Sequence, residues 1–395
     1  MSRPTSIPPL WQPTLVLLVA AQAAFAMAWS VFLLVPKYMS EALGADPATI
    51  GRVTGSSYVA AIVSIPLVAW VLGRFGRRTV FAWGAVACAG QAAAFLFIDA
   101  VGPLLFAAQM VWGLAFVLSF NAGNAMVVDH APAPRMGEAL GIFGAANVMM
   151  TAVASSTVEA VVGHLGWTAT LVGASLFAGL AGVLSFWMPR DRVAGSEPTP
   201  PRERWLDAAL LRLALAEVAW GSAYATITVF YQPFVLSQGV RDVSGFFVGF
   251  ASAAVGVRVF LGRWIDRWGR RRIACASMLV YAAAAFTLPT MTGATMIVFG
   301  AWIGLAHGLL HPALSSLAAE GRPFRHRGGV FAVMTGGFML GSAIGTVGLG
   351  RFVQGASDPS VFVVAGVGLL LGLVFVLPGP LGRPWQRALR PGATA

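Results

Sequence analysis

Apolar segments of about 20 residues recur along the chain, and they constrain its fold more than any other feature. A helix that crosses a hydrocarbon core of roughly 30 Å at about 1.5 Å per residue needs about this length. Twelve such segments can be counted in the 395 residues, of which 57% are hydrophobic and 10% are charged. Because lipid offers no hydrogen-bond partner to the backbone, we predict an all-α integral membrane protein with twelve transmembrane helices.

The twelve segments fall into two groups of six. The predicted spans are 14–36, 50–72, 79–98, 103–128, 139–163 and 167–188, followed by 208–236, 245–261, 273–289, 296–318, 329–352 and 361–377. Between the groups, "PRDRVAGSEPTPPRERW" mixes charge with four prolines, as is typical of an exposed linker. We therefore predict a bundle over residues 1–188, a linker over 189–206, a second bundle over 207–379 and a tail over 380–395.

The basic residues are distributed unevenly between the loops. If the odd-numbered spans run outward, the inward loops and tails hold 20 of the 26 Lys and Arg residues, and the outward loops hold four. The positive-inside rule then predicts that both termini lie in the cytoplasm. The same rule accounts for the net charge of +11, so no nucleic-acid partner is expected. Cys88 and Cys275 lie in different apolar segments, which argues against a disulfide framework or a cysteine metal site.

One basic loop occurs twice, at equivalent places in the two halves. "LGRWIDRWGRRRI" follows the eighth span, and "AWVLGRFGRR" follows the second. These loops resemble the signature of the major facilitator superfamily, which is close to G-x-x-x-D-R-x-G-R-R. The second copy fills every position, with Gly262, Asp266, Arg267, Gly269, Arg270 and Arg271. The first copy has Ala69 and Gly73 at the first glycine and the aspartate, and it keeps Arg74, Gly76, Arg77 and Arg78.

The resemblance implies two pseudo-symmetric six-helix bundles, alternating access, no cofactor and a protein that works as a monomer. It also implies that Asp266, with Arg267 and Arg271, latches the outward-facing state, although arginines that only set topology and contact anionic lipid are the alternative. The chain looks most like bacterial sugar-efflux or drug-efflux permeases, through "VRVFLGRWIDRWGRR" and "GLLHPALSSL". That likeness implies the bacterial cytoplasmic (inner) membrane.

Glu217 is the strongest candidate for proton coupling. It lies about ten residues into the seventh predicted span, near the middle of the membrane, where an ionisable residue is costly. Helical spacing places Gly221, Tyr224, Thr228 and Tyr231 on its face. The alternative is an acid that is permanently satisfied by hydrogen bonds or by an arginine.

His307 and His311 are four residues apart in the tenth predicted span, so they share a helix face. Proton relay or substrate contact, transition-metal binding and helix packing are the three interpretations. A metal site is the weakest of them, because no third ligand is identifiable nearby in the sequence. Pro312 removes a backbone amide beside the pair and can kink the helix.

In the superfamily, spans one, four, seven and ten line a central cavity. Carried over by position, the resemblance assigns to a substrate cavity Gln22, Trp29, Gln109, Asn121, Asn124, Tyr224, Tyr231, His307 and His311, with Glu217 and His307 in proton coupling. Gln109 stands where many proton-coupled relatives carry an arginine, and the fifth span lacks the glycine-proline motif of drug-proton antiporters. Both departures weaken the implied coupling. Glu159, Arg258 and Asp129 lie near span ends, where interfacial positions are favoured.

A secondary transporter is the leading interpretation of these features, with proton-driven export of a small organic molecule as the predicted activity. Uptake or facilitated diffusion of a sugar or other metabolite is the alternative. A polytopic membrane enzyme is a distant third, because no nucleophile and base pair is recognisable near an interface. The sequence contains no G-x-x-x-x-G-K-[ST] pattern, so ATP-driven pumping by this chain is not supported.

Overall fold

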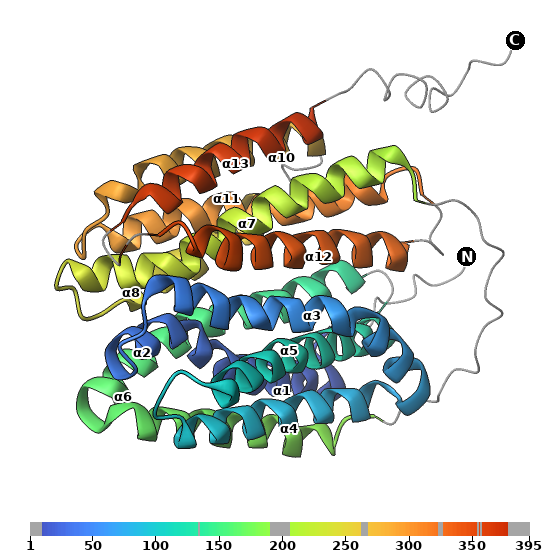
Figure 1. Ribbon diagram of the computed structural model, residues 1–395. Helices are drawn as coiled ribbons and strands as arrows, with labels where there is room; N and C mark the ends of the chain where they lie inside the picture. The colour runs from blue at the N-terminus through green and yellow to red at the C-terminus, as the bar shows by residue number, and fades with distance from the viewer. Residues whose placement is uncertain are drawn as a thin grey trace, which may run out of the picture.

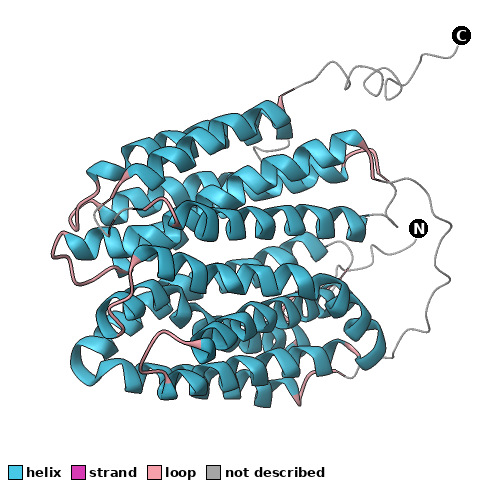
Figure 2. Cartoon of the chain, viewed as in Figure 1, coloured by secondary structure: helices cyan, strands magenta, loops and turns pink. Residues whose placement is uncertain are grey.

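The computed structural model describes residues 10–132, 135–189, 206–261, 268–322, 327–353, 355 and 358–377. Within these ranges the chain is helical and contains no strand (Figure 2). The helices lie side by side in two groups, one from each half of the chain (Figure 1).

The first half contains six spans. Its elements are α1 (Pro13–Val31), η1 (Phe32–Leu34), α2 (Val35–Ala42), α3 (Pro47–Phe75), α4 (Arg77–Ala94), η2 (Phe95–Phe97), α5 (Pro103–His130) and α6 (Met136–Ser185). The first three elements follow one another without a loop and make a single span. In α6 the backbone turns at Gly166, whose φ of 78° is in the left-handed region that glycine adopts easily. The fifth and sixth predicted spans therefore meet at Gly166.

The second half repeats this pattern. Its elements are α7 (Ala208–Ser237), α8 (Ser244–Leu261), α10 (Arg270–Thr287), η4 (Leu288–Thr290), α11 (Met296–Ala319), α12 (Arg327–Ala343), the π-helical η6 (Ile344–Gly348) and α13 (Ser360–Val376). In the described part of the chain, nine helices are long and apolar enough to cross a membrane, and two shorter apolar helices accompany them. With α6 divided at Gly166, these helices are the twelve predicted spans.

The end of the first span differs from the prediction. The predicted boundary at Pro36 falls inside a helix, because α1 continues through η1 into α2 as far as Ala42. Pro36 lies in the first turn of α2, where its missing N–H breaks no helical hydrogen bond. Lys37 was expected in an outward loop, and it is instead a helical residue that is only 3% exposed.

Equivalent helices pair in the two halves. The contact of α3 with α5 corresponds to that of α8 with α11, and the contact of α4 with α6 corresponds to that of α10 with α13. Glycines allow these helices to approach closely. This is usual in membranes, where no hydrophobic effect drives helices together and close packing of the backbones stabilises their association. A Cβ on Gly113 of α5 would meet the Ser57 carbonyl of α3, and a Cβ on Gly304 of α11 would meet the Phe250 carbonyl of α8. Close backbone packing therefore sets the distance between these helices.

Gly304→Ala tests this packing. The added methyl group would overlap the Phe250 carbonyl oxygen, so α8 and α11 must separate, and overpacking of this kind costs about 1–3 kcal/mol. We expect the purified protein in detergent to unfold at a temperature lower by several degrees, as followed by tryptophan fluorescence. Gly256→Ala on α8 is the control, because a Cβ there meets nothing within 4 Å. Equal unfolding temperatures for the two variants would contradict the close approach.

Candidate functional site

Aromatic and imidazole rings from four helices of the second half meet around Trp220. The Trp220 ring centroid lies 5.0 Å from that of His307, 5.7 Å from that of His311 and 4.7 Å from that of Phe338. Tyr224 and Phe250 approach His307 at 5.2 and 5.0 Å. We refer to these residues as the ring cluster, which consists of Trp220, Tyr224, Phe250, His307, His311 and Phe338.

Local helix geometry brings the ring cluster together. Trp220 and Tyr224 are one turn apart on α7, and His307 and His311 are one turn apart on α11, so each pair projects from one face. The close contact of Gly304 with Phe250 brings α8 to the same place. His307 is eleven residues from the start of α11, which places it roughly 16 Å along the helix and near mid-membrane.

Arg258 of α8 lies within electrostatic range of both histidines. Its side chain is half-buried, and its Nε has no hydrogen-bond partner among the described residues. His307 is also half-buried, whereas His311 is exposed. His311 also contacts Trp220, which is 1% exposed. The interfacial position expected for Arg258 stays a prediction.

Glu217 is fully buried, with 0% exposure. Neither carboxyl oxygen has a hydrogen-bond partner in the described part of the chain, so the alternative of a permanently satisfied acid finds no donor there. A Cβ on Gly337 of α12 would lie 3.3 Å from the Glu217 Cβ, so Glu217 lies close to α12. The residues predicted to share its face separate: Tyr224 joins the ring cluster, while Tyr231 stacks on Phe246 at 4.3 Å and is fully buried.

The first half presents a row of stacked aromatic rings. Trp29 of α1 stacks on Trp112 of α5 with centroids 4.4 Å apart and an interplanar angle of 4°. Phe116 lies 4.6 Å from Trp29, and Phe120 continues the row 5.0 Å beyond Phe116. Trp112 Nε1 donates to the Trp29 carbonyl at 3.0 Å, which ties α5 to α1. Sequence reasoning identified Trp29 but not its partners, although Trp112, Phe116 and Phe120 follow at four-residue spacing.

The amide candidates of the first half have different surroundings. Gln22 donates to Asn147 of α6 at 2.9 Å. Asn121 and Asn124 donate to the carbonyls of Val117 and Phe120 in their own helix, at 2.7 and 2.9 Å. Gln109 is buried, and its Nε2 has no partner among the described residues. The structure therefore does not bring these amides together with the ring cluster, and their role in a cavity stays a prediction.

A buried ion pair of the first half bonds to the second half at the end of the molecule that carries loops 43–46 and 238–243, which we call the outer end. Lys37 Nζ of α2 contacts Glu159 Oε2 of α6 at 2.5 Å, and their side chains are 4% and 10% exposed. Lys37 Nζ also donates to the Arg241 carbonyl of the second half. Glu159 Oε1 accepts from the Val243 amide at 3.0 Å. Both charged groups are therefore bonded to the loop before α8.

Gln232 of α7 completes this contact from the second half. Its Oε1 accepts from the Lys37 amide at 3.2 Å, and its Nε2 donates to the Leu33 carbonyl at 2.8 Å. The bend at η1 frees these backbone groups from the regular helical pattern. We call Lys37, Glu159, Gln232 and the Arg241–Val243 backbone the outer lock. Sequence reasoning favoured a structural role for Glu159 but could not identify its partner.

The repeated basic loops lie at the opposite end, which we call the basic end. Arg77 pairs with Asp129 at the end of α5, and Arg270 lies 4.0 Å from Glu320 at the end of α11. Gly76 and Gly269, before these arginines, have φ values of 79° and 88°. Each of the two ion pairs stays within one half of the protein. The sequence carried a signal for the acids, because "DHAP" and "EGRP" follow the fourth span of each half.

The predicted latch lies partly outside the described residues. Gly262, Asp266 and Arg267 fall in the gap 262–267, so the assignment of a latch to the second copy stays a prediction. In the first copy, Arg78 Nη1 donates to the Met188 carbonyl at 3.2 Å, again within the first half. The described residues contain no group of three His, Cys, Asp or Glu that could hold a metal ion, so no third ligand accompanies the histidine pair there.

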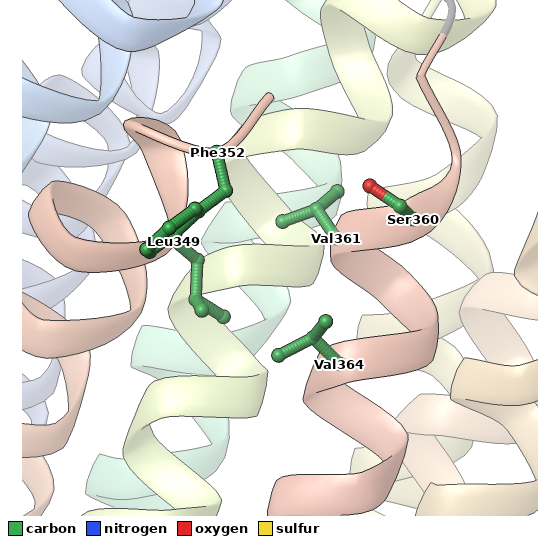
Figure 3. A pocket seen from close by; sticks show the side chains of 5 residues that line it. All are labelled: Leu349, Phe352, Ser360, Val361 and Val364. Atoms are coloured by element: carbon green, nitrogen blue, oxygen red, sulfur yellow. The ribbon is translucent and has the colours of Figure 1, made fainter. Parts of the chain in front are cut away.

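An apolar cavity of about 260 Å³ lies between the end of η6 and the start of α13. Figure 3 shows its lining, formed by Leu349, Phe352, Ser360, Val361 and Val364. Phe352 is 75% exposed and no lining residue is ionisable, so this cavity suits an acyl chain better than a polar solute. It is separate from the ring cluster and from Glu217.

Two similar bundles with ionisable groups at membrane depth define the class of secondary transporters. The sequence profile of the Major Facilitator Superfamily matches residues 16–260 and 243–394, and the chain belongs to this family. The predicted family and fold are thereby confirmed, and so, at the level of the family, is a transporter rather than an enzyme.

Curated relatives and solved structures agree with this assignment. The chain is 27% identical over 157 residues to the probable galactarate/D-glucarate transporter GudP of Escherichia coli, covering 38% of this chain and 34% of that protein. It is 25% identical over 138 residues to the probable anion transporter 5 of Arabidopsis thaliana, covering 34% and 31%. The matches therefore span about a third of each relative's length.

The solved structures support the fold alone. The inward-open xylose transporter XylE of E. coli superposes with a TM-score of 0.73 at 13% identity, over 91% of this chain and 94% of that one. The nucleoside transporter NupG superposes with a TM-score of 0.71 at 14% identity, over 92% and 98%.

Breaking the outer lock should open the outer end. Lys37→Met leaves Glu159 as an uncompensated buried charge, and removing one partner of such a pair costs about 3–5 kcal/mol. The reporter is Thr228→Cys in a Cys88→Ala, Cys275→Ala background, because Thr228 is buried one helical turn deeper than Gln232. We expect this cysteine to react with an impermeant maleimide added outside at least tenfold faster when Lys37→Met is present than when the lock is intact. Glu159→Gln should act similarly.

The double variant Lys37→Met, Glu159→Gln should increase the labelling rate by less than the product of the two single increases, because it leaves no unpaired charge. Arg52→Gln is the control, since Arg52 is exposed at the outer end and donates to Thr49. Unchanged labelling in both single variants would contradict the lock.

Proposed function

We propose that the chain is a secondary transporter that moves a small organic solute by alternating access, and that this structure is the state closed at the outer end. The single observation that supports this proposal most is the outer lock, because it adds hydrogen bonds of buried charged groups to the apolar packing between the halves. A midplane site with the outer end closed is the arrangement that rocking of two halves requires.

Hydrogen bonds to charged groups are suited to a contact that must form and break in every cycle. Opening would break the bonds of Lys37 and Glu159 to the Arg241 carbonyl and the Val243 amide, and water can replace these bonds, so the net cost of opening is small. Large interdigitated apolar side chains at the same place would instead lose their whole burial energy on opening. The outer lock thus specifies the closed state without making it irreversible.

Glu217 is the group that we propose carries the coupled proton. An ionised carboxylate at membrane depth without a donor or a counter-ion is costly, and the described residues supply neither. A neutral carboxyl group avoids that cost. When the halves rock and water reaches α7, Glu217 can release its proton. Glu217 therefore exchanges protons with the side of the membrane to which it is open at that moment.

The substrate and direction are proposed from the curated relatives. Their names refer to an anion and to galactarate and D-glucarate, which favours the alternative of metabolite uptake over the predicted export. Entry of an anion into a negative interior costs about 2.3 kcal/mol per charge per 100 mV. Proton symport offsets this cost, so we propose uptake of a small metabolite together with protons.

The cellular setting is proposed from the charge distribution and the resemblance. The excess of Lys and Arg in alternate loops supports cytoplasmic termini, so the basic end would face the cell interior. We propose a location in the bacterial cytoplasmic membrane and function as a single chain.

Glu217→Gln tests the coupling. The amide cannot take up and release a proton, so we expect transport driven by an imposed pH gradient in proteoliposomes to fall by at least tenfold. Exchange of labelled for unlabelled D-glucarate without a gradient should remain within about twofold of the original protein, because exchange needs no net proton movement.

Glu138→Gln is the matched control, because Glu138 is exposed and bonded to Arg135 at 2.9 Å, away from the ring cluster. It should transport normally. Gradient-driven uptake that Glu217→Gln leaves unchanged would contradict the coupling. Gradient-driven loss of D-glucarate from the lumen of right-side-out vesicles would show that the protein exports its substrate, and would contradict the proposed uptake.

A further inference from the structure

Arg258 lies in the last turn of α8 and has no hydrogen-bond or ion-pair partner among the described residues. It takes part in no ion pair with any described carboxylate, and its Nε is buried without an acceptor. An arginine almost never remains unpaired in a span, because desolvation of the guanidinium is offset only by an anion or by carbonyl acceptors. The structure therefore contains a cationic group whose acceptor is not supplied by the described part of the protein.

The two histidines lie at the level of this guanidinium. Helices α8 and α11 run in the same direction, and Gly304 and Gly308 of α11 contact Phe250 and Ala254 of α8. This register places residues near 311 beside Arg258, in agreement with the electrostatic interaction of Arg258 with both imidazoles. The buried Nδ1 of His307 also has no partner among the described residues, and His311 is exposed.

The charge of this site selects an anion. No ion pair joins Arg258 to Glu217 or to any other carboxylate among the described residues, so the guanidinium charge is not neutralised by one of them. A guanidinium offers a planar pair of N–H donors that matches a carboxylate, and each neutral imidazole offers one more N–H donor. The rings of Trp220, Tyr224 and Phe250 pack against the two imidazoles and give the site an apolar wall, which strengthens bonds from these donors to an anion.

We propose that Arg258, His307 and His311 bind a carboxylate group of the transported solute, so that the substrate is an organic anion. This proposal deepens the proposed function and rests on it, because it assigns the substrate class at the same midplane site. Arg258 makes the charged contact, and the histidines complete the hydrogen bonds. Glu217 is left free to carry the proton that an entering anion requires.

The test measures binding by the purified full-length protein in detergent at constant ionic strength, with tryptophan fluorescence as the readout. The probes are D-glucarate, D-gluconate, succinate and benzoate, with D-glucitol as the neutral counterpart of D-glucarate. We expect at least one carboxylate to bind at least tenfold more tightly than D-glucitol. Arg258→Gln should weaken that carboxylate by at least tenfold, Arg258→Lys should weaken it less, and His311→Gln should have an intermediate effect.

Arg52→Gln, which removes an arginine from the exposed outer end, should leave binding unchanged. Unfolding temperature and elution volume identify any variant that fails to fold, and Arg258→Lys keeps the test decisive if Arg258→Gln does so. The proposal is overturned if D-glucitol binds as tightly as every carboxylate, if no carboxylate binds, or if a folded Arg258 variant binds normally. Binding needs no gradient, so Glu217→Gln should still bind, and failure of coupling remains distinguishable from failure of this site.

Discussion

The cost of an unpaired charge in a dry environment organises this molecule. A hydrocarbon core accepts a charged group only when the group is paired, neutralised or surrounded by water. The chain applies each solution at a different place. Lys37 is paired with Glu159 at the outer end, Glu217 is buried without a donor among the described residues, and Arg258 faces two histidines in the bundle interior.

These three places give the proposed cycle its physical basis. In the state seen here, a buried ion pair closes the outer end and the ring cluster keeps its ionisable groups near mid-membrane. Opening the outer end would expose Lys37 and Glu159 to water, which replaces their lost bonds to the Arg241 carbonyl and the Val243 amide. An arriving anion would supply the acceptor that Arg258 lacks, and a proton would keep Glu217 neutral when it is buried again. Each step exchanges one way of satisfying a charge for another.

The internal repeat explains why the halves can move as units. Arg77 with Asp129, and Arg270 with Glu320, join neighbouring helices at the basic end of each half. Gly113 against Ser57, and Gly304 against Phe250, bring equivalent helices into backbone contact. Close backbone packing and ion pairs within each half favour rigid-body rocking over deformation of either bundle.

Much of the fold could be predicted because the signals are local. Segment length predicted twelve spans, and the repeat of the basic loop predicted two similar halves. The outer lock could not be found in this way, because Lys37 and Glu159 meet across 122 residues and the helix continues past Pro36. Glu217 and the histidine pair were identified from their cost in lipid. Trp220 was not identified and Arg258 was assigned an interfacial position, because the proposed site depends on the register of α7, α8 and α11, which a single sequence does not specify.

The central claim is that the two halves rock about the midplane, and distances between spin labels measure this most directly. One pair would replace the exposed residues Ala42 and Asp242 at the outer end, and the other would replace Val128 and Glu320 at the basic end. When bound anion and pH are varied, the account predicts that the outer distance lengthens as the basic-end distance shortens. Two distances that stay constant, or that change in the same direction, would contradict it.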